Sequence, residues 1–179
     1  MIIRAAYATR ARGGLGRAKA GARYVIHRPG DDGRREYRTG FDRDNDRVDK
    51  DEVYDRLEGA DGDYYYRLTL APGEGRGTAA DMHDWTREVM DRLHERAGDC
   101  DWVAWEHRDH SNHDHVHVIA VLDQRLDRDD LRDLRECADD AWQRACERYR
   151  DPLEADLHRD HDRDPARDGD RDRDHAPSP

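Results

Sequence analysis

The stretch Trp105–Leu122, WEHRDHSNHDHVHVIAVL, joins a cluster of histidines to a run of apolar residues. Five of the eleven histidines of the chain fall between His107 and His117. The apolar run Val118–Leu122 is typical of a buried strand. Because alternate residues of a strand point to one face, the side chains of His115 and His117 should lie side by side. Two neighbouring imidazoles at the start of a rigid strand predict part of a divalent-metal site.

The third metal ligand is open among three histidines that precede this pair. His107 is favoured, and His110 and His113 are the alternatives. Imidazole ligands suit Mn²⁺ and other first-row metals, whereas Mg²⁺ prefers oxygen ligands. A structural zinc site would usually use thiolates, and the three cysteines show no paired C-x-x-C spacing. The expected cofactor is a divalent metal, Mn²⁺ or Mg²⁺, with other first-row metals as alternatives, and the imidazole ligands favour Mn²⁺ over Mg²⁺.

The rest of the chain reads as alternating strands and helices around this stretch. Hydrophobic periodicity predicts strands at 2–8, 34–41, 63–70, 102–107 and 115–122, and helices at 17–27, 51–57, 78–97 and 129–149. Thr78 should cap the third helix, with Asp81 at the capping-box position. The short link between the last two strands suits an antiparallel hairpin. The predicted fold class is α+β, with a mostly antiparallel central sheet and helices packed on it.

Length and composition favour one domain followed by a tail. The chain has 179 residues, of which 35% are hydrophobic and 42% charged. We assign residues 1–150 to the domain and residues 151–179, rich in Arg and Asp, to a disordered tail. No apolar run approaches a membrane span, and three widely spaced cysteines without a signal peptide favour a reducing interior. The expected location is cytoplasmic, without a membrane partner.

Charge is distributed unevenly along the chain. The formal net charge is −11, which at first argues against a nucleic-acid partner. However, residues 1–41 contain ten Lys and Arg against three acidic residues. A basic N-terminal segment on an acidic body can still form a local phosphate-binding patch.

Tyrosine, arginine and histidine together predict phosphodiester chemistry. Tyr24 lies in the basic segment, on the helix predicted at 17–27. A tyrosine hydroxyl can attack phosphorus and form a covalent phosphotyrosine, and a metal held by imidazoles can stabilise the developing charge. Tyr7 and Tyr37 are the fallback nucleophiles.

Three segments of the sequence resemble the plasmid relaxases, or mobilisation proteins, of the HUH endonuclease class. Residues 21–29, GARYVIHRP, resemble the family's first motif, whose tyrosine is the nucleophile. Residues 65–74, YYRLTLAPGE, resemble the second motif, which contacts DNA beside the scissile bond. His107-Arg108-Asp109 with residues 115–118, HVHV, resembles the third motif, which holds the metal. The likeness covers roughly residues 1–125 and departs from the family pattern by a one-residue insertion after His107.

The resemblance implies the HUH sandwich fold and a set of roles for individual residues. Tyr24 would be the nucleophile, Asp109 would orient an imidazole, and His107, His115 and His117 would hold the metal. DNA contacts would come from four further residues: Arg23, Arg28, Arg67 and Thr69. The implied activity is site- and strand-specific nicking of single-stranded DNA at a transfer or replication origin, with a 5′-phosphotyrosine intermediate.

Other functions remain open at this point. A replication initiator or a transposase of the HUH class would use the same chemistry at a different origin. A non-catalytic module that binds single-stranded DNA or metal is the alternative from another class. Accessory mobilisation proteins are expected partners of a plasmid relaxase.

Overall fold

The computed structural model describes residues 1–29, 37–72, 82–107 and 114–161, with side chains up to Glu147. Its strands are β1 (Ile2–Thr9), β2 (Tyr64–Ala71), β3 (Cys100–His107) and β4 (His115–Leu122). They form one sheet in the order β1-β2-β4-β3, and every neighbouring pair is antiparallel. The predicted fold class, an antiparallel sheet with helices packed on it, is therefore confirmed.

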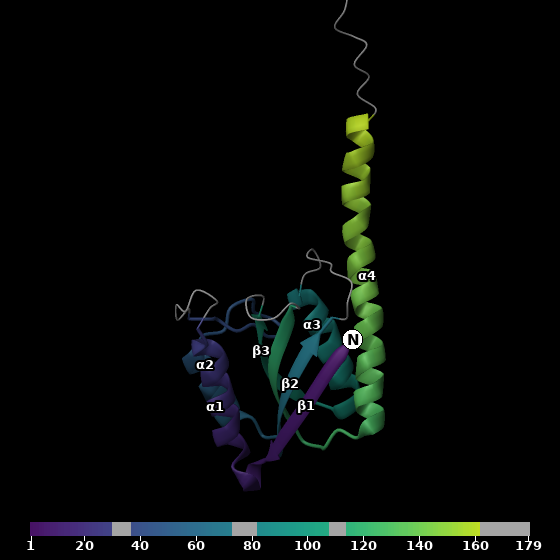
Figure 1. Cartoon of the computed structure of the whole chain (residues 1–179). Coiled ribbons are helices and arrows are strands. Elements are labelled where there is room, and N and C mark those ends of the chain that lie inside the picture. The colour runs from purple at the N-terminus through teal and green to yellow at the C-terminus, as the bar shows by residue number, and fades with distance from the viewer. Residues whose placement is uncertain (30–36, 73–81, 108–113, 162–179) are drawn as a thin grey trace, which may run out of the picture.

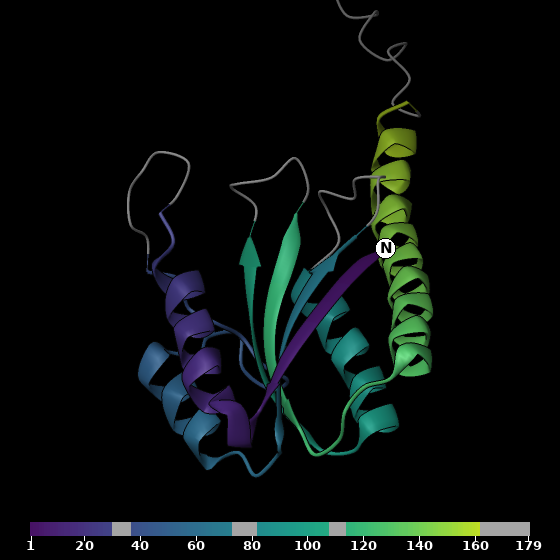
Figure 2. The ribbon, with the colours of Figure 1, turned by 60° about the horizontal axis from the view of Figure 1, so that its bottom comes forward.

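Two layers of helices cover the two faces of the sheet. The helices are η1 (Arg10–Arg12), α1 (Gly14–His27), α2 (Lys50–Gly59), α3 (Met82–Ala97) and α4 (Arg128–His161). Figure 1 shows α1 and α2 on one side of the sheet and α3 and α4 on the other. In Figure 2 the C-terminal end of α1 lies at the same end of the sheet as the end of β3 and the start of β4. This arrangement brings the predicted nucleophile and the histidine cluster to one end of the molecule.

Alternation along the strands divides the core into two parts. On β3, Trp102 and Ala104 pack in the core under α3 and α4, whereas Val103 and Trp105 pack under α1 and α2. The odd-numbered positions of β3 and β4 thus share the face that α1 covers, because successive residues of a strand point to opposite faces. His107, at the end of β3, lies on this second face.

Gly14 allows the start of α1 to lie directly against the sheet. A Cβ atom there would lie 2.5 Å from Cδ2 of Tyr65 and 2.9 Å from the backbone oxygens of Ala8 and Thr9. Such distances are shorter than van der Waals contact allows, so a side chain would force the helix outward. The close contact at Gly14 therefore defines where α1 begins relative to β1 and β2.

A short segment between α1 and α2 covers the free edge of β3. Phe41 and Ala104 exchange backbone hydrogen bonds of 2.9 and 2.8 Å, and Gly40 pairs with Val48. Asp42 is buried, and its carboxylate accepts hydrogen bonds from the backbone N–H groups of Asp44 and Asn45 and a contact from Arg56. Covering the edge in this way blocks the pairing of β3 with another chain.

Two predicted elements differ from the structure, and one predicted helix cap is not tested by it. Residues 37–41 of the strand predicted at 34–41 form only isolated bridges, and 34–36 lie outside the described residues. The prediction was wrong for 37–41 because this segment packs across the edge of β3. Helix α4, predicted to end at Tyr149, continues through Pro152 to His161, because good helix formers follow the proline. Thr78 and Asp81, the predicted cap of α3, lie outside the described residues.

None of the helices in the described part of the chain combines the length and apolar character needed to cross a bilayer.

Candidate metal centre and adjoining cleft

Three imidazoles converge where β3 ends and β4 begins. His107 pairs directly with His115 across the two strands, and His117 lies two residues further along β4. The ring centroids are 5.3 Å apart for His107 and His115, 4.8 Å for His107 and His117, and 4.9 Å for His115 and His117. One ring nitrogen from each residue lies within 4.8 Å of the other two. The antiparallel pairing thus assembles the cluster that the H-x-H pattern indicated.

Side chains around the cluster contact two of the three rings. His107 is buried, and Nη1 of Arg38 lies 3.3 Å from its Nδ1. Thr69, on β2, pairs with His117 across the sheet, and its Oγ1 lies 3.4 Å from Nδ1 of His117. Both contacts involve the Nδ1 atom of the histidine ring. In His117 the other ring nitrogen, Nε2, lies on the side of the ring away from Thr69.

The environment of His117 favours its neutral form. Burial, followed by the positive charge of His115 when protonated and of the nearby Arg28, Arg38 and Arg67, lowers the pKa of His117 to about 4. At neutral pH its imidazole therefore carries a lone pair. Neutral imidazole is the form that binds divalent metals. The geometry and protonation of the cluster accordingly fit a first-row divalent metal.

A cleft lies between α1 and the sheet, next to the histidine cluster. It has a volume of about 300 Å³ and is lined by Tyr24 and Gly21 of α1, by Arg4 of β1, and by Arg67, Thr69 and His117 of the sheet. Tyr24 is 60% exposed, so its side chain is accessible from solvent. A candidate nucleophile and a candidate metal ligand thus line the same cavity, although they are far apart in sequence.

The two fallback tyrosines occupy different surroundings. Tyr7 packs against Tyr64 and Tyr66, on the face of the sheet that α3 and α4 cover. This places Tyr7 on the face opposite the histidine cluster. Tyr37 lies beside His27, and its hydroxyl oxygen accepts a hydrogen bond of 2.8 Å from the backbone N–H of Lys50. Among these three tyrosines, Tyr24 is therefore the one that lines the cleft with His117.

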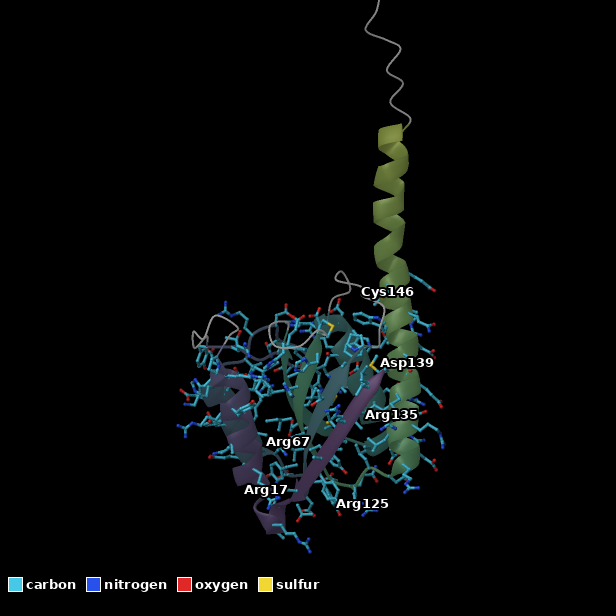
Figure 3. The ribbon with its side chains drawn as sticks, viewed as in Figure 1. Arg17, Arg67, Arg125, Arg135, Asp139 and Cys146 are labelled. Carbon is cyan, nitrogen blue, oxygen red and sulfur yellow. The ribbon has the colours of Figure 1, made fainter. Side chains whose placement is uncertain are left out.

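The arginines predicted to bind DNA divide into two groups. Arg67 lines the cleft, and Figure 3 shows it in the space between α1 and the strands. Arg28 lies 5.8 Å from the ring centroid of Tyr24 and close enough to His117 to affect its pKa. Arg23 is exposed on α1 and does not line the cleft.

Two arginines near the site were not singled out from the sequence. Arg38 lies in the basic N-terminal segment, but its contact with His107 depends on how the segment before Phe41 packs on β3. Arg4 was not selected, although the alternation of β1 and its pairing with Thr69 place it on the cleft side. The sequence feature that could have identified Arg4 is that it is the one charged residue of β1.

Asp109, His110 and His113 lie outside the described residues. The structure therefore places His107 in the cluster and leaves the roles proposed for these three residues as predictions.

A family model for the relaxase nuclease domain, of the MobA/VirD2-like type, matches residues 30–154. This span is more than half of the chain, and the chain belongs to this relaxase family. The matched span contains the whole histidine cluster and Arg67, and it begins after α1, so Tyr24 lies outside it. No curated protein and no solved structure matches the chain significantly.

Proposed function

We propose that this chain is a relaxase that nicks single-stranded DNA at a specific site, using Tyr24 as the nucleophile and a divalent metal held by His107, His115 and His117. The observation that carries the proposal is the shared cleft, which Tyr24 lines together with His117. Family membership supports nuclease chemistry, and the fit of the three imidazoles supports metal dependence.

The residues of the cleft have distinct parts in the proposed reaction. The hydroxyl oxygen of Tyr24 forms a bond to phosphorus while the bond from phosphorus to the 3′ oxygen breaks. The tyrosine proton leaves, the 3′ oxygen gains a proton, and the products are a 5′-phosphotyrosine and a free 3′-OH. Arg28 lies beside Tyr24 and would bind a phosphate of the strand. A bound metal supplies stabilisation of the negative charge on the non-bridging phosphate oxygens.

The proposed substrate is single-stranded DNA at a plasmid transfer origin, and the proposed role is plasmid mobilisation or conjugative transfer. Arg23, Arg67 and Thr69 complete the proposed DNA contacts, and Asp109 the orientation of an imidazole. Accessory mobilisation proteins are the expected partners at such an origin. Replication initiation or transposition would use the same site, and these functions differ from mobilisation in the DNA that is nicked.

A nicking assay tests this proposal. The protein is incubated with end-labelled single-stranded DNA covering candidate origins, with Mn²⁺ and, in parallel, with a chelator. The expected result is a metal-dependent nick and a protein–DNA adduct that resists denaturation, with the phosphate mapped to Tyr24 by mass spectrometry. Single-strand binding without a nick or an adduct on any of these DNAs would instead identify a non-catalytic module.

A further inference from the structure

We infer that the cleft beside His117 is a base-recognition pocket that binds an unpaired guanine next to the scissile phosphate, with Arg67 as the residue that reads it. This inference rests on the proposed nicking function and deepens it, because it names a nucleotide that the DNA must carry.

The size and walls of the cleft suit a planar base better than a phosphate group. Its volume of about 300 Å³ falls at the lower end of the range of ligand pockets. Its walls include the apolar side chains of Ala6, Val25 and Ile119. A phosphate gains little from such walls, whereas the faces of a nucleobase bury well against apolar side chains.

The charged groups of the cleft are hydrogen-bond donors. Arg4 and Arg67 line it, and no acidic side chain of the described residues does. An occupant must therefore present acceptors to these guanidinium groups. Guanine presents O6 and N7 as adjacent acceptors, and arginine binds this pair with two parallel hydrogen bonds. Adenine replaces O6 with a donor amino group, so it cannot make both bonds.

The stem of the Arg67 side chain lies between β1 and α1 at the cleft. Its position on β2 pairs with Ala6 on β1, whose small side chain leaves space beside it. On the other side, a Cβ atom at Gly21 of α1 would lie 3.2 Å from Cδ of Arg67. The stem of Arg67 thus passes close to α1, and its side chain lines the cleft, although the residue is exposed to solvent. Contact of the stem with the helix reduces the conformational entropy that Arg67 loses on binding.

The pocket also lies beside the reacting groups, because Tyr24 and His117 contribute to its lining. The guanine it binds should therefore occupy one fixed position adjacent to the scissile phosphate. Binding of the base there would place the phosphate against the tyrosine, which links recognition to the geometry of attack.

Selection from a randomised library tests the inference. A single-stranded DNA library with a randomised central block is incubated with the protein and Mn²⁺, and covalent adducts are isolated and sequenced. We expect guanine enriched at least about fivefold at one position fixed relative to the nick. Arg67→Lys keeps the charge but lacks the planar fork, so the adducts that this variant forms should lose the guanine enrichment. Arg132→Lys, an exposed substitution on α4, is the matched control.

Adducts that form with no fixed guanine, or with another base at that position, would overturn the inference and leave the nicking function standing.

If the wild-type protein forms no adduct, the proposed function fails, and a binding experiment then tests the pocket separately. The four deoxynucleoside 5′-monophosphates are titrated with a chelator present, and the Arg67 side-chain N–H signals are followed by NMR. We expect dGMP to bind at least about fivefold more tightly than the other three. Equal binding of all four would indicate a phosphate site and would reject a guanine pocket.

Discussion

Thr69 and His117 face each other across the β2–β4 pair, with Oγ1 of the threonine 3.4 Å from Nδ1 of the histidine. A hydroxyl at this point can accept the Nδ1–H bond and thereby leave the lone pair of Nε2 for a metal. Thr69 is also a proposed DNA contact, and this position predicts a second role for it, orienting His117 as a metal ligand.

Thr69→Val should therefore weaken Mn²⁺ binding by about 10- to 100-fold, because partners of metal-bound histidines orient the ring. Isothermal titration calorimetry measures the affinity directly. Thr69→Ser keeps the hydroxyl and should bind Mn²⁺ nearly as the wild-type protein does. A valine variant with unchanged metal affinity and weaker DNA binding in a chelator would assign Thr69 to the DNA instead.

Tyr24→Phe should abolish the covalent adduct, because the substitution removes the attacking oxygen and little else. Metal affinity and single-strand binding should remain near wild-type values, as measured by calorimetry and fluorescence anisotropy. Tyr37→Phe is the matched control, since the hydroxyl of Tyr37 already accepts a hydrogen bond from Lys50. An adduct that persists in Tyr24→Phe and disappears in Tyr37→Phe would reverse the assignment.

The sequence predicted the parts of the fold and site that depend on local patterns. The spacing of His115 and His117 and the apolar run after them were enough to place both imidazoles on one face of β4. The contact between Arg38 and His107 was not predictable, because it arises from packing of the segment around Phe41 on the edge of β3. No periodicity marks such irregular segments, so the strand predicted there was wrong for its described residues.

Metal binding should stabilise the fold through the histidine cluster. At a free Mn²⁺ concentration of 100 times Kd, the gain is about 2.7 kcal/mol, which corresponds to a rise in Tm of roughly 5–10 °C. His107→Ala should lose most of this rise, measured by differential scanning fluorimetry with Mn²⁺ and with a chelator. His94→Ala, on α3, is the control and should keep it. An undiminished rise in His107→Ala would move the third ligand to His110 or His113.

Asp42 should contribute to the dependence of stability on pH. Burial alone would raise the pKa of Asp42, but hydrogen bonds from Asp44, Asn45 and Arg56 outweigh it and hold the pKa below its ordinary value. The stabilisation that ionised Asp42 contributes to the fold is therefore complete above the pKa of an unfolded-state Asp, about 4. This stabilisation is lost as the pH falls through the lower pKa of Asp42 in the folded state.

Asp42→Asn should accordingly lower the free energy of unfolding by about 2 kcal/mol at pH 7, because charged hydrogen bonds are lost. The difference from wild type should shrink as the pH falls below about 4. Urea unfolding at a series of pH values measures both effects. Asp44→Asn, at an exposed position, should show neither, and a constant difference for Asp42→Asn at all pH values would contradict the ionised state of Asp42.

Truncation after Pro152 should preserve both Tm and the nicking rate. Among the described side chains of α4, Leu134, Ala138 and Ala141 are buried in the core, and Leu131 and Trp142 pack against it, all before the cut. Removal of α4 from Leu134 onward is the comparison and should destabilise the fold. A marked loss of stability or activity in the shorter truncation would show that residues 153–179 pack or bind.

The tight contact at Gly14 holds the start of α1 against β1 and β2, so any tilt of the helix would pivot about this point. Tyr24 lies ten residues along this helix, at a distance of about 15 Å from the pivot. A tilt of only about 4° would move the tyrosine by about 1 Å, and a displacement of that size can reduce a reaction rate about 100-fold. The position of Tyr24, the proposed nucleophile, is thus set by a residue without a side chain at the opposite end of the helix.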